Sequence, residues 1–333
     1  MMTALLIVAG LFLLYIGGEG LVRGSVSIAR RFGLSELIIG LTLIGFGTSL
    51  PELVTSLRAL STDAVGLSVG NVIGSNIANV LLVLGAAAVV APIITSPKSL
   101  ARDATCMVLA TIALMLVLWL DMFTRTVGIA MFSMLLVYLV GSIILDHRQN
   151  GAAGDLHGDE ASLVEAGDPL WLAVALTVVG ICGVVLGARF LVDGGTIAAR
   201  SLGVSETVIG ISVLAIGTSL PELVTSLVAA RKGKADVALG NVLGSNIFNI
   251  LSILGLSAII YPFSVMVEVA GRSEPVSLVA AMDIVVLAAS VLLLGFFAFV
   301  RKRIGRLEGL VFLIGYGLYV ALRYGLLSGL GVA

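Results

Sequence analysis

The chain has 333 residues, of which 59% are hydrophobic and only 12% are charged, and its mean hydropathy is +1.16. Soluble domains are about half apolar and a quarter charged, so this composition indicates a protein embedded in a lipid bilayer. The formal net charge of −1 and the lack of a basic patch interleaved with aromatic residues argue against a nucleic-acid-binding protein. The two cysteines, Cys106 and Cys182, lie far apart in apolar runs, which excludes a disulfide framework or a CxxC metal site.

Apolar runs of about 20 residues, the length needed to cross a bilayer, follow one another along most of the chain. The first begins near the N-terminus, which lacks a basic region and a small-residue cleavage site, so we interpret it as a spanning helix and not as a removable signal peptide. A polar, acid-rich linker, 146–168, separates a first half, 1–145, from a second half, 169–333. The ten predicted spans, five in each half, are approximately 3–22, 37–60, 67–91, 104–120, 127–145, 170–192, 206–230, 237–261, 278–300 and 307–327.

The two halves repeat each other at a constant offset of 170 residues. The stretch Gly47–Leu57, GTSLPELVTSL, recurs letter for letter at Gly217–Leu227. The same offset carries the Gly-Asn and Gly-Ser-Asn elements of Gly70–Asn79 onto those of Gly240–Asn249, with no gap in between. This match indicates that a unit of five spans has been duplicated.

An odd number of spans in each repeat turns the second half upside down relative to the first. With the N-terminus outside, most of the basic residues, among them Arg30, Arg31 and Arg301, lie on the cytoplasmic side, in agreement with the positive-inside rule. The sequence therefore predicts a multi-pass protein of the cell (inner) membrane, with both termini outside and the linker in the cytoplasm. Inverted repeats are typical of secondary transporters, which bind ions near the middle of the bilayer where broken helices meet.

Each copy of the repeated stretch carries one acid within an apolar run, Glu52 or Glu222. An ionised side chain at the centre of a membrane helix costs about 2.5–3.5 kcal/mol on insertion scales, so two acids at matching positions indicate a bound counter-ion. Pro51 has no N–H to donate, and together with Gly45 and Gly47 it predicts a broken helix whose freed backbone oxygens face a cavity or the protein interior.

Oxygen-bearing side chains accompany both acids. Thr48 lies one helical turn before Glu52, and Ser75 and Asn79 lie four residues apart on one face of the next span. Carboxylate, hydroxyl and carbonyl oxygens, without His or Cys, favour a hard cation such as Na⁺ or Ca²⁺ over zinc or copper. Two carboxylates carry a charge of −2, which balances either one Ca²⁺ or two Na⁺ and so allows mutually exclusive binding. The polar candidates are Thr48, Ser49, Ser75 and Asn79 in the first repeat and Thr218, Ser219, Ser245 and Asn249 in the second.

Other polar and small residues have a structural interpretation. The remaining asparagines of these spans are expected to satisfy the backbone of broken helices instead of binding ions; they are Asn71, Asn76, Asn241 and Asn246. The glycines at positions 70 and 74, and again at 240 and 244, are spaced four apart and are expected to let neighbouring helices approach closely.

The G-T-S-x-P-E element followed by G-S-N, at 47–52 and 74–76 and again at 217–222 and 244–246, resembles the signature of the cation/Ca²⁺ exchanger superfamily, and in particular its prokaryotic sodium/calcium exchanger group. The resemblance implies that spans 2, 3, 7 and 8 pack around the ions while spans 1 and 6 move to expose the site to each side in turn. It also implies that Glu52 and Glu222 bind both Ca²⁺ and Na⁺, and that the carbonyls of Gly45 and Ala215 complete the outer Na⁺ sites.

One departure from the family pattern concerns Asn79 and Asn249, because many members of the superfamily carry an Asp at one of these positions. Two neutral amides here remove a third central carboxylate, which leaves the stoichiometry open. They also weaken the case for K⁺ co-transport, since the K⁺-dependent branch typically uses an acid at this place.

The sequence therefore predicts an all-α integral membrane protein with ten transmembrane helices in two inverted repeats, acting as a Na⁺/Ca²⁺ antiporter and not as an enzyme. Its expected partners are Ca²⁺, Na⁺ and the lipid bilayer, with no cofactor beyond the transported ions. A Ca²⁺/H⁺ exchanger on the same fold stays open, because protons compete for close carboxylates. An intramembrane carboxylate protease fits less well, since that chemistry uses two Asp, and a passive channel does not explain the inverted repeats.

Overall fold

The computed structural model describes residues 2–93, 97–154, 168–201, 217–267, 276–301 and 303–323. Helices make up nearly all of these ranges. The strand pair found within them, β1 (Met266–Val267) and β2 (Val276–Ser277), is antiparallel, and each strand has only two residues. The predicted helical class is therefore confirmed, and the short strand pair is a feature that hydropathy did not predict.

Seven helices within these ranges are long and apolar enough to cross a membrane. An eighth span results if the helical segments Glu36–Thr48 and Leu50–Leu60, which a break separates, are counted together. All eight coincide with predicted spans. Two predicted spans are left, 206–230 and 307–327, and the helices described in them are α11 (Leu220–Arg231) and α15 (Arg306–Arg323). The seven are Met2–Arg31, Val65–Val90, Ala101–Leu120, Arg125–Asp146, Leu170–Ala198, Ala235–Ile260 and Ala281–Arg301.

The helices pack into two compact units, and each unit takes segments from both halves of the sequence. The first unit comprises Met1–Thr48 and Leu136–Gly244, and the second comprises Ser49–Leu135 and Ser245–Ala333. One boundary falls inside the first GTSLPE stretch and another inside the second GSN element. Two helices, α8 (Arg125–Gly154) and α12 (Ala235–Ile247), run from one unit into the other.

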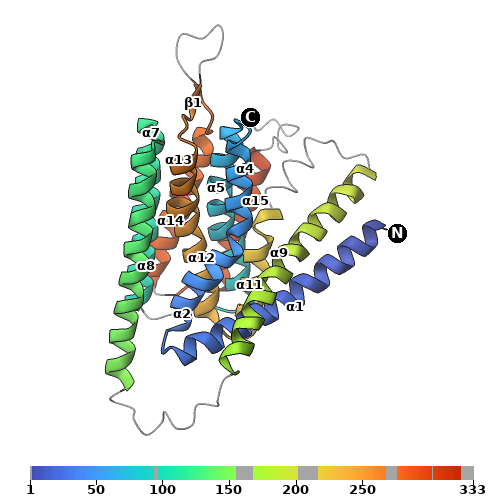
Figure 1. Cartoon of the computed structure of the whole chain (residues 1–333), viewed down its shortest axis with the longest axis vertical. Helices are drawn as coiled ribbons and strands as arrows, with labels where there is room; N and C mark the ends of the chain where they lie inside the picture. The colour runs from blue at the N-terminus through green and yellow to red at the C-terminus, as the bar shows by residue number, and fades with distance from the viewer. Residues whose placement is uncertain are drawn as a thin grey trace. The chain divides into compact units, whose positions relative to one another are not determined.

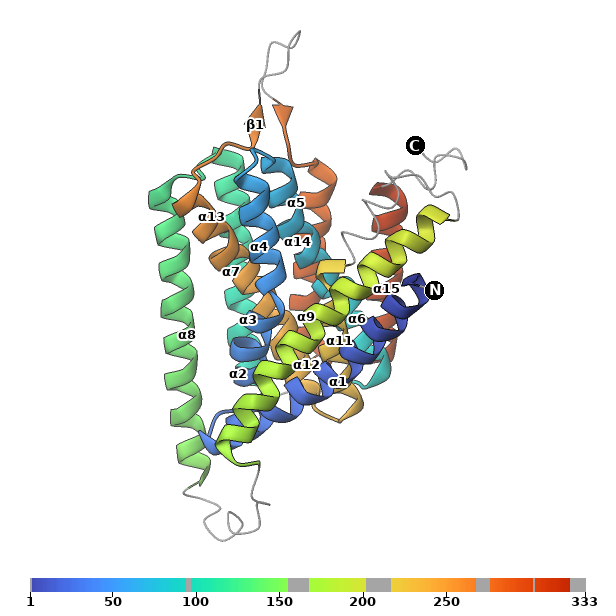
Figure 2. The same ribbon diagram turned by 45° about the vertical axis from the view of Figure 1, so that its right-hand side comes forward.

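In the first unit, α1 (Met2–Arg31) and α9 (Leu170–Ser201) lie side by side, as Figures 1 and 2 both show. Their glycines bring the two backbones into contact. A Cβ atom added at Gly10 would lie 2.8 Å from the backbone nitrogen of Leu191, and one at Gly17 would lie 2.6 Å from that of Val184. Side chains larger than glycine at these positions would therefore force the helices apart. The first unit also contains α2 (Glu36–Ile39), the π-helical turn η1 (Gly40–Ile44), α3 (Gly45–Thr48) and α11.

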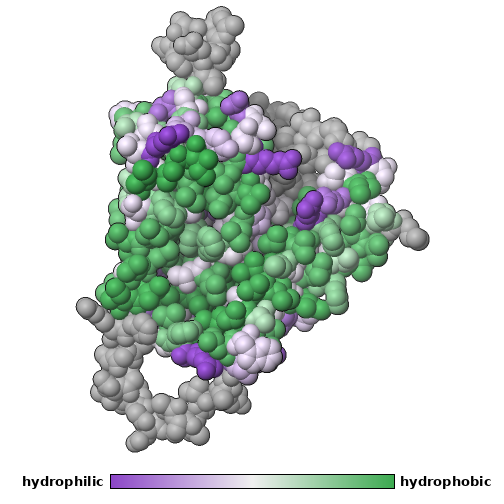
Figure 3. Space-filling model, in the orientation of Figure 1, coloured by the Kyte–Doolittle hydropathy of each residue, from purple (hydrophilic) through white to green (hydrophobic). Residues whose placement is uncertain are grey.

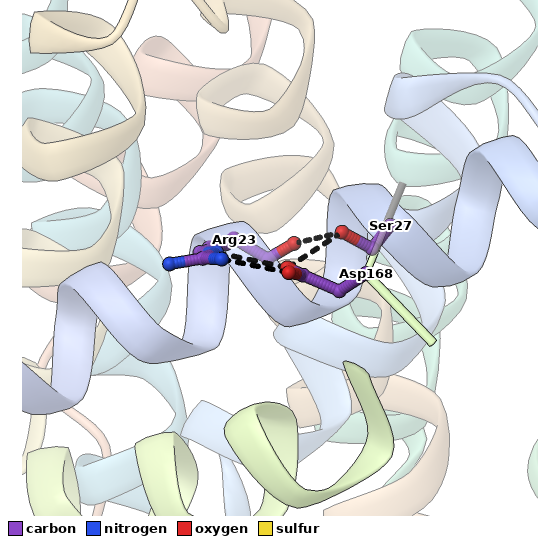
Figure 4. Close-up of polar contacts among 3 residues, drawn as sticks. All are labelled: Arg23, Ser27 and Asp168. Atoms are coloured by element: carbon purple, nitrogen blue, oxygen red, sulfur yellow. Dashed lines mark hydrogen bonds and ion pairs between the residues drawn. The ribbon is translucent and has the colours of Figure 1, made fainter. Parts of the chain in front are cut away.

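The segment before α9 is tied to α1 by an ion pair. The Arg23 guanidinium donates two hydrogen bonds to the Asp168 carboxylate, from Nε at 2.8 Å and from Nη2 at 2.7 Å, and the Ser27 hydroxyl lies 3.4 Å from the same carboxylate (Figure 4). The hydrogen bonds from Arg23 lower the pKa of Asp168 below its ordinary value. The pair joins the end of the linker to the first helix.

Asp168→Asn is expected to lower the apparent melting temperature slightly at neutral pH, because a pair with an exposed guanidinium contributes little. The folded-state pKa of Asp168 is lowered, so its contribution is fully present above the ordinary aspartate value of 3.8 and is lost as the pH falls through the lower folded value. The thermal curves of wild type and variant should therefore converge in acid, and also in about 1 M salt, where charges are screened within about 3 Å. Asp193→Asn, which removes a 4.0 Å exposed contact to Arg189, is the control and should change nothing.

In the second unit, the continuous span of α5 (Val65–Ala78), η2 (Asn79–Leu84) and α6 (Gly85–Val90) is mostly buried. α4 (Leu50–Leu60) packs beside α5, which Figure 2 shows, and α15 packs along α6. Backbone contact again depends on glycine, because a Cβ added at Gly309 would lie 2.7 Å from the carbonyl oxygen of Gly85. The other helices of this unit are α7 (Pro97–Leu120), η4 (Phe248–Leu254), α13 (Gly255–Ile260), α14 (Ala281–Phe296) and η5 (Phe297–Arg301).

The half-buried start of α14 is joined to the end of α15 through an acid. Asp283 accepts hydrogen bonds from the Tyr319 hydroxyl and from Arg323 Nε, both at 3.0 Å. A carboxylate in this position needs such partners, because a buried charge without them is costly. The start of α14 and the end of α15 are therefore held together by polar contacts.

The outer surface of the helices is apolar. Figure 3 shows hydrophobic residues over most of the visible helical surface, with polar residues gathered towards its edges. Large apolar side chains point outwards, among them Trp119 (82% exposed) and Val137 (73%) on α7 and α8. A contiguous apolar surface of this extent is unfavourable in water and is typical of contact with lipid. The structure thus agrees with a multi-pass membrane protein.

Candidate functional site

Both GTSLPE stretches interrupt a helix at the same residue. The helix breaks at Ser49 (φ −86°, ψ 3°) and again at Ser219 (φ −88°, ψ 3°), and α4 and α11 begin at the next residue. The proline that follows occupies the first turn of the new helix, where its missing N–H has no intrahelical partner to lose. The predicted break is therefore confirmed in both copies.

The two acids lie in the first turns of these new helices. Glu52 is 0% exposed on α4, and Glu222 is 1% exposed on α11. A negative charge is favourable at a helix N-terminus, because the first N–H groups carry partial positive charge. Glu222 thus lies buried in the first compact unit, and Glu52 lies buried in the second.

An asparagine of the following span fixes the backbone of each glutamate. Asn71 Nδ2 donates to the carbonyl oxygen of Glu52 at 3.3 Å and to Ser56 Oγ at 3.0 Å. In the other unit, Asn241 Nδ2 donates to the carbonyl oxygen of Glu222 at 3.3 Å and to Ser226 Oγ at 2.9 Å. The structural interpretation of these two asparagines is confirmed. Asn76 also behaves as expected, since its Nδ2 donates to the Val72 carbonyl at 2.8 Å.

Asn246 behaves differently, and the structural prediction for it is wrong. Its Oδ1 accepts a hydrogen bond from Asn79 Nδ2 at 3.1 Å, and its own Nδ2 donates to the sulfur of Met107 at 3.4 Å. It therefore binds two side chains and not the backbone. The Gly-Ser-Asn-Ile context does not distinguish it from Asn76, because it is the same for both asparagines.

The two threonines before the breaks are not equivalent. Thr48 is buried, and its Oγ1 lies 3.1 Å from the Ile44 carbonyl, 3.4 Å from the Gly45 carbonyl and 3.2 Å from Asn241 Oδ1. Thr218 Oγ1 has no hydrogen-bond partner within the ranges described. The two repeats therefore share the GTSLPELVTSL stretch but not all of its described side-chain contacts. Ala215, predicted as a carbonyl ligand, lies outside the described residues.

The second polar face predicted for the two repeats is buried. Ser75 and Asn79 are at most 3% exposed, and Ser245 and Asn249 are 0% exposed. Asn79 begins the π-helical segment η2, and Asn249 lies near the start of η4. Such π-helical turns are rare and occur frequently at functional sites. Neither the Oδ1 nor the Nδ2 of Asn249 has a hydrogen-bond partner among the residues that the structure describes.

The predicted close approach of helices at glycine is confirmed for the second repeat. In the first unit, α12 crosses the segment of α2 and η1 in backbone contact. A Cβ added at Gly244 would lie 2.7 Å from Leu41 Cα, and one at Gly40 would lie 2.6 Å from the Val237 carbonyl oxygen. For Gly70 and Gly74 no described residue lies within 4 Å of an added Cβ, so this part of the prediction stays untested.

The candidate residues are therefore divided between the units. Each set combines one carboxylate with hydroxyl, carbonyl or amide oxygens, which are the ligands that hard cations prefer. The first unit holds Gly45, Thr48, Thr218, Ser219 and Glu222, and the second holds Ser49, Glu52, Ser75, Asn79, Ser245 and Asn249.

The chain is similar to known proteins over nearly its full length. A family model described as "Sodium/calcium exchanger protein" matches residues 2–144 and 172–325. The chain is 34% identical over 316 residues to the putative antiporter CaxA of Alkalimonas amylolytica, and this match covers 95% of the chain and 97% of CaxA. It is 33% identical over 297 residues to the sodium/calcium exchanger MaX1 of Methanosarcina acetivorans, with 78% of the chain and 84% of MaX1 covered.

Solved structures of the sodium-calcium exchanger NCX_Mj have the same fold. One of them, soaked with Na⁺ and Sr²⁺, gives a TM-score of 0.79 at 34% sequence identity and covers 96% of this chain and 98% of the exchanger chain. The similarity therefore extends through both halves of the sequence, including both GTSLPE stretches and both GSN elements.

Proposed function

The chain belongs to the sodium/calcium exchanger protein family, and we propose that it exchanges Na⁺ for Ca²⁺ across the cell membrane by alternating access. In this proposal the inward Na⁺ gradient drives Ca²⁺ out of the cell. The linker 146–168 lies in the cytoplasm, and both termini lie outside. The ten helices form two inverted repeats of five spans, in which helices broken at Ser49 and Ser219 contribute the ion ligands.

The observation that carries the proposal is the burial of Glu52 and Glu222 at matching positions of the two repeats. Moving an ionised carboxylate from water into a protein interior within the bilayer is unfavourable. A cation offsets this cost, and a total charge of −2 suits either one Ca²⁺ or two Na⁺. Because one Ca²⁺ and two Na⁺ would bind to the same carboxylates, binding of one kind of ion excludes the other. This mutual exclusion is the basic requirement of an antiporter.

The hydroxyl, amide and carbonyl oxygens complete the coordination in this proposal. A Ca²⁺ ion takes six to eight oxygen ligands, so two glutamates alone do not satisfy it. The neutral oxygens supply the remaining ligands without changing the charge. They are those of Thr48, Thr218, Ser49, Ser219, Ser75, Ser245, Asn79 and Asn249, with the backbone carbonyls of Gly45 and Ala215 at the outer Na⁺ sites.

The helix pair α1 and α9 is the element that we propose to move. Its glycines hold the two backbones together, so the pair is suited to move as one body. Spans 2, 3, 7 and 8, which carry the candidate ligands, would then stay packed while the pair exposes them to each side in turn.

The test is ⁴⁵Ca²⁺ uptake into proteoliposomes in which the Na⁺, K⁺ and pH gradients are set independently. An outward Na⁺ gradient is expected to drive uptake, and adding K⁺ is expected to have no effect, because Asn79 and Asn249 replace the acid typical of K⁺-dependent relatives. Uptake driven by a pH gradient in Na⁺-free medium, with none driven by Na⁺, would instead identify a Ca²⁺/H⁺ exchanger. Protein-free liposomes under the same gradients are the control.

A further inference from the structure

Three buried side chains of the second unit form a hydrogen-bonded relay. Asn79 Nδ2 donates to Asn246 Oδ1 at 3.1 Å, and Asn246 Nδ2 donates to Met107 Sδ at 3.4 Å. All three residues are 1% exposed, and they come from η2, α12 and α7. The relay therefore connects a candidate ion ligand to a methionine that carries no charge and lies in a different helix.

The methionine determines which atom donates and which accepts in each hydrogen bond of this relay. A thioether sulfur can accept a hydrogen bond but cannot donate one. Asn246 must therefore turn its NH₂ group towards Met107, which leaves its carbonyl oxygen facing Asn79. Because that oxygen accepts only, Asn79 must in turn present its own NH₂ group. The Oδ1 of Asn79 is then left as the free end of its amide, and no described residue donates to it.

The two corresponding asparagines of the repeats, Asn76 and Asn249, do not form such a relay with the described residues. Asn76, the counterpart of Asn246, donates to the Val72 carbonyl of its own helix at 2.8 Å. Asn249, the counterpart of Asn79, has no hydrogen-bond partner on either amide atom within the described part of the chain. The relay therefore belongs to one repeat only and makes the two central amides inequivalent.

We propose that Met107 and Asn246 are positioning residues that hold Asn79 with its carbonyl oxygen available to the transported cation. This inference rests on the proposed function, in which Asn79 is an ion ligand. An amide presenting its NH₂ group repels a cation, whereas the same amide presenting its oxygen binds one. The sulfur of Met107 thus sets affinity without contacting the ion.

The first test is Met107→Leu, which keeps the apolar volume but removes the acceptor. The KM for Ca²⁺ in Na⁺-driven exchange is expected to rise by about three- to tenfold, the factor that corresponds to one neutral hydrogen bond, while kcat changes by less than about twofold. The matched control is Met131→Leu, since Met131 is also buried and its sulfur accepts no hydrogen bond from the described residues. Its KM should equal that of the wild type.

A double-mutant cycle separates orientation from general packing. In Asn79→Asp both terminal atoms at position 79 are oxygens, so turning the group over has no effect. Met107→Leu in the Asn79→Asp background should therefore leave the KM unchanged within about twofold, whatever the KM of the single Asn79→Asp variant. An increase of the same factor in both backgrounds would assign the effect to packing and overturn the proposal.

Failure of the relay and failure of the proposed function give different experimental results. If Met107→Leu does not yield a monodisperse protein on size-exclusion chromatography, Asn246→Ala, which removes the acceptor for Asn79 directly, enters the same cycle with the same expectation. Equal KM values for Met107→Leu and Met131→Leu in a wild-type protein that does exchange Na⁺ for Ca²⁺ would refute the relay. Absence of exchange in the wild type would instead refute the proposed function on which the relay rests.

Discussion

Replacing either Glu52 or Glu222 by Gln is expected to abolish Na⁺-driven Ca²⁺ uptake. Both glutamates are buried. In the proposed site, each substitution removes one of the two carboxylates and leaves a total charge of −1 to balance a divalent ion. Removing one partner from a buried charge pair typically costs about 3–5 kcal/mol, which corresponds to a loss of affinity of at least about 100-fold. Isothermal titration of Ca²⁺ into the purified protein and uptake into proteoliposomes would both report this loss.

Glu19→Gln is the matched control for these two variants. Glu19 also lies on a membrane helix, but it is partly exposed and paired with Lys232. It has no acid at the corresponding position of the second repeat, where Arg189 stands. Uptake by this variant should stay within about twofold of the wild type, because exposed ion pairs contribute little. Transport that survives in Glu52→Gln or Glu222→Gln at the wild-type rate would contradict the site assignment.

Gly244→Ala is expected to remove most of the folded protein. The added Cβ would lie 2.7 Å from Leu41 Cα, and a backbone atom cannot rotate away as a side chain can. Overpacking of a core ordinarily costs about 1–3 kcal/mol, and contact with a backbone atom places this variant at the upper end of that range or above it. The amount of monodisperse protein on size-exclusion chromatography and its apparent melting temperature measure the effect.

Gly141→Ala provides the comparison for this glycine variant. Gly141 lies within α8, and no described residue approaches an added Cβ there within 4 Å. Alanine is preferred over glycine inside a helix by about 1 kcal/mol, so this variant should be as stable as the wild type or slightly more stable. Equal behaviour of Gly244→Ala and Gly141→Ala would show that the crossing of α12 with η1 is looser than the structure indicates.

Hydropathy and the internal repeat predict most of the fold, because the features concerned depend on local chemistry. The buried span Val65–Val90 follows from its apolar length, and the breaks at Ser49 and Ser219 follow from the neighbouring proline and glycines. The burial of Glu52 and Glu222 follows from their position inside apolar runs. These inferences need only the residue and its immediate neighbours.

Other features depend on neighbours that are distant in the sequence, and the sequence alone does not reveal them. Asn76 and Asn246 stand in identical tetrapeptides, yet only Asn246 meets a sulfur acceptor, which α7 provides. The π-helical turns η2 and η4 carry no composition signal, because the extra residue in the turn is accommodated by packing against other helices. Thr48 and Thr218 likewise differ in their described contacts, although both stand in the same GTSLPELVTSL stretch.

The pairing of α1 with α9 has a consequence for biosynthesis. The glycine face of α1 (Met2–Arg31) meets its partner only when α9 (Leu170–Ser201) has been made. At about 5–20 residues per second, a ribosome needs roughly 10 to 30 s to make the intervening chain. During that time the exposed backbone of α1 faces lipid or the insertion machinery. α1 therefore packs against a helix, α9, that is synthesised much later. Assembly of the first unit cannot simply follow the order of translation.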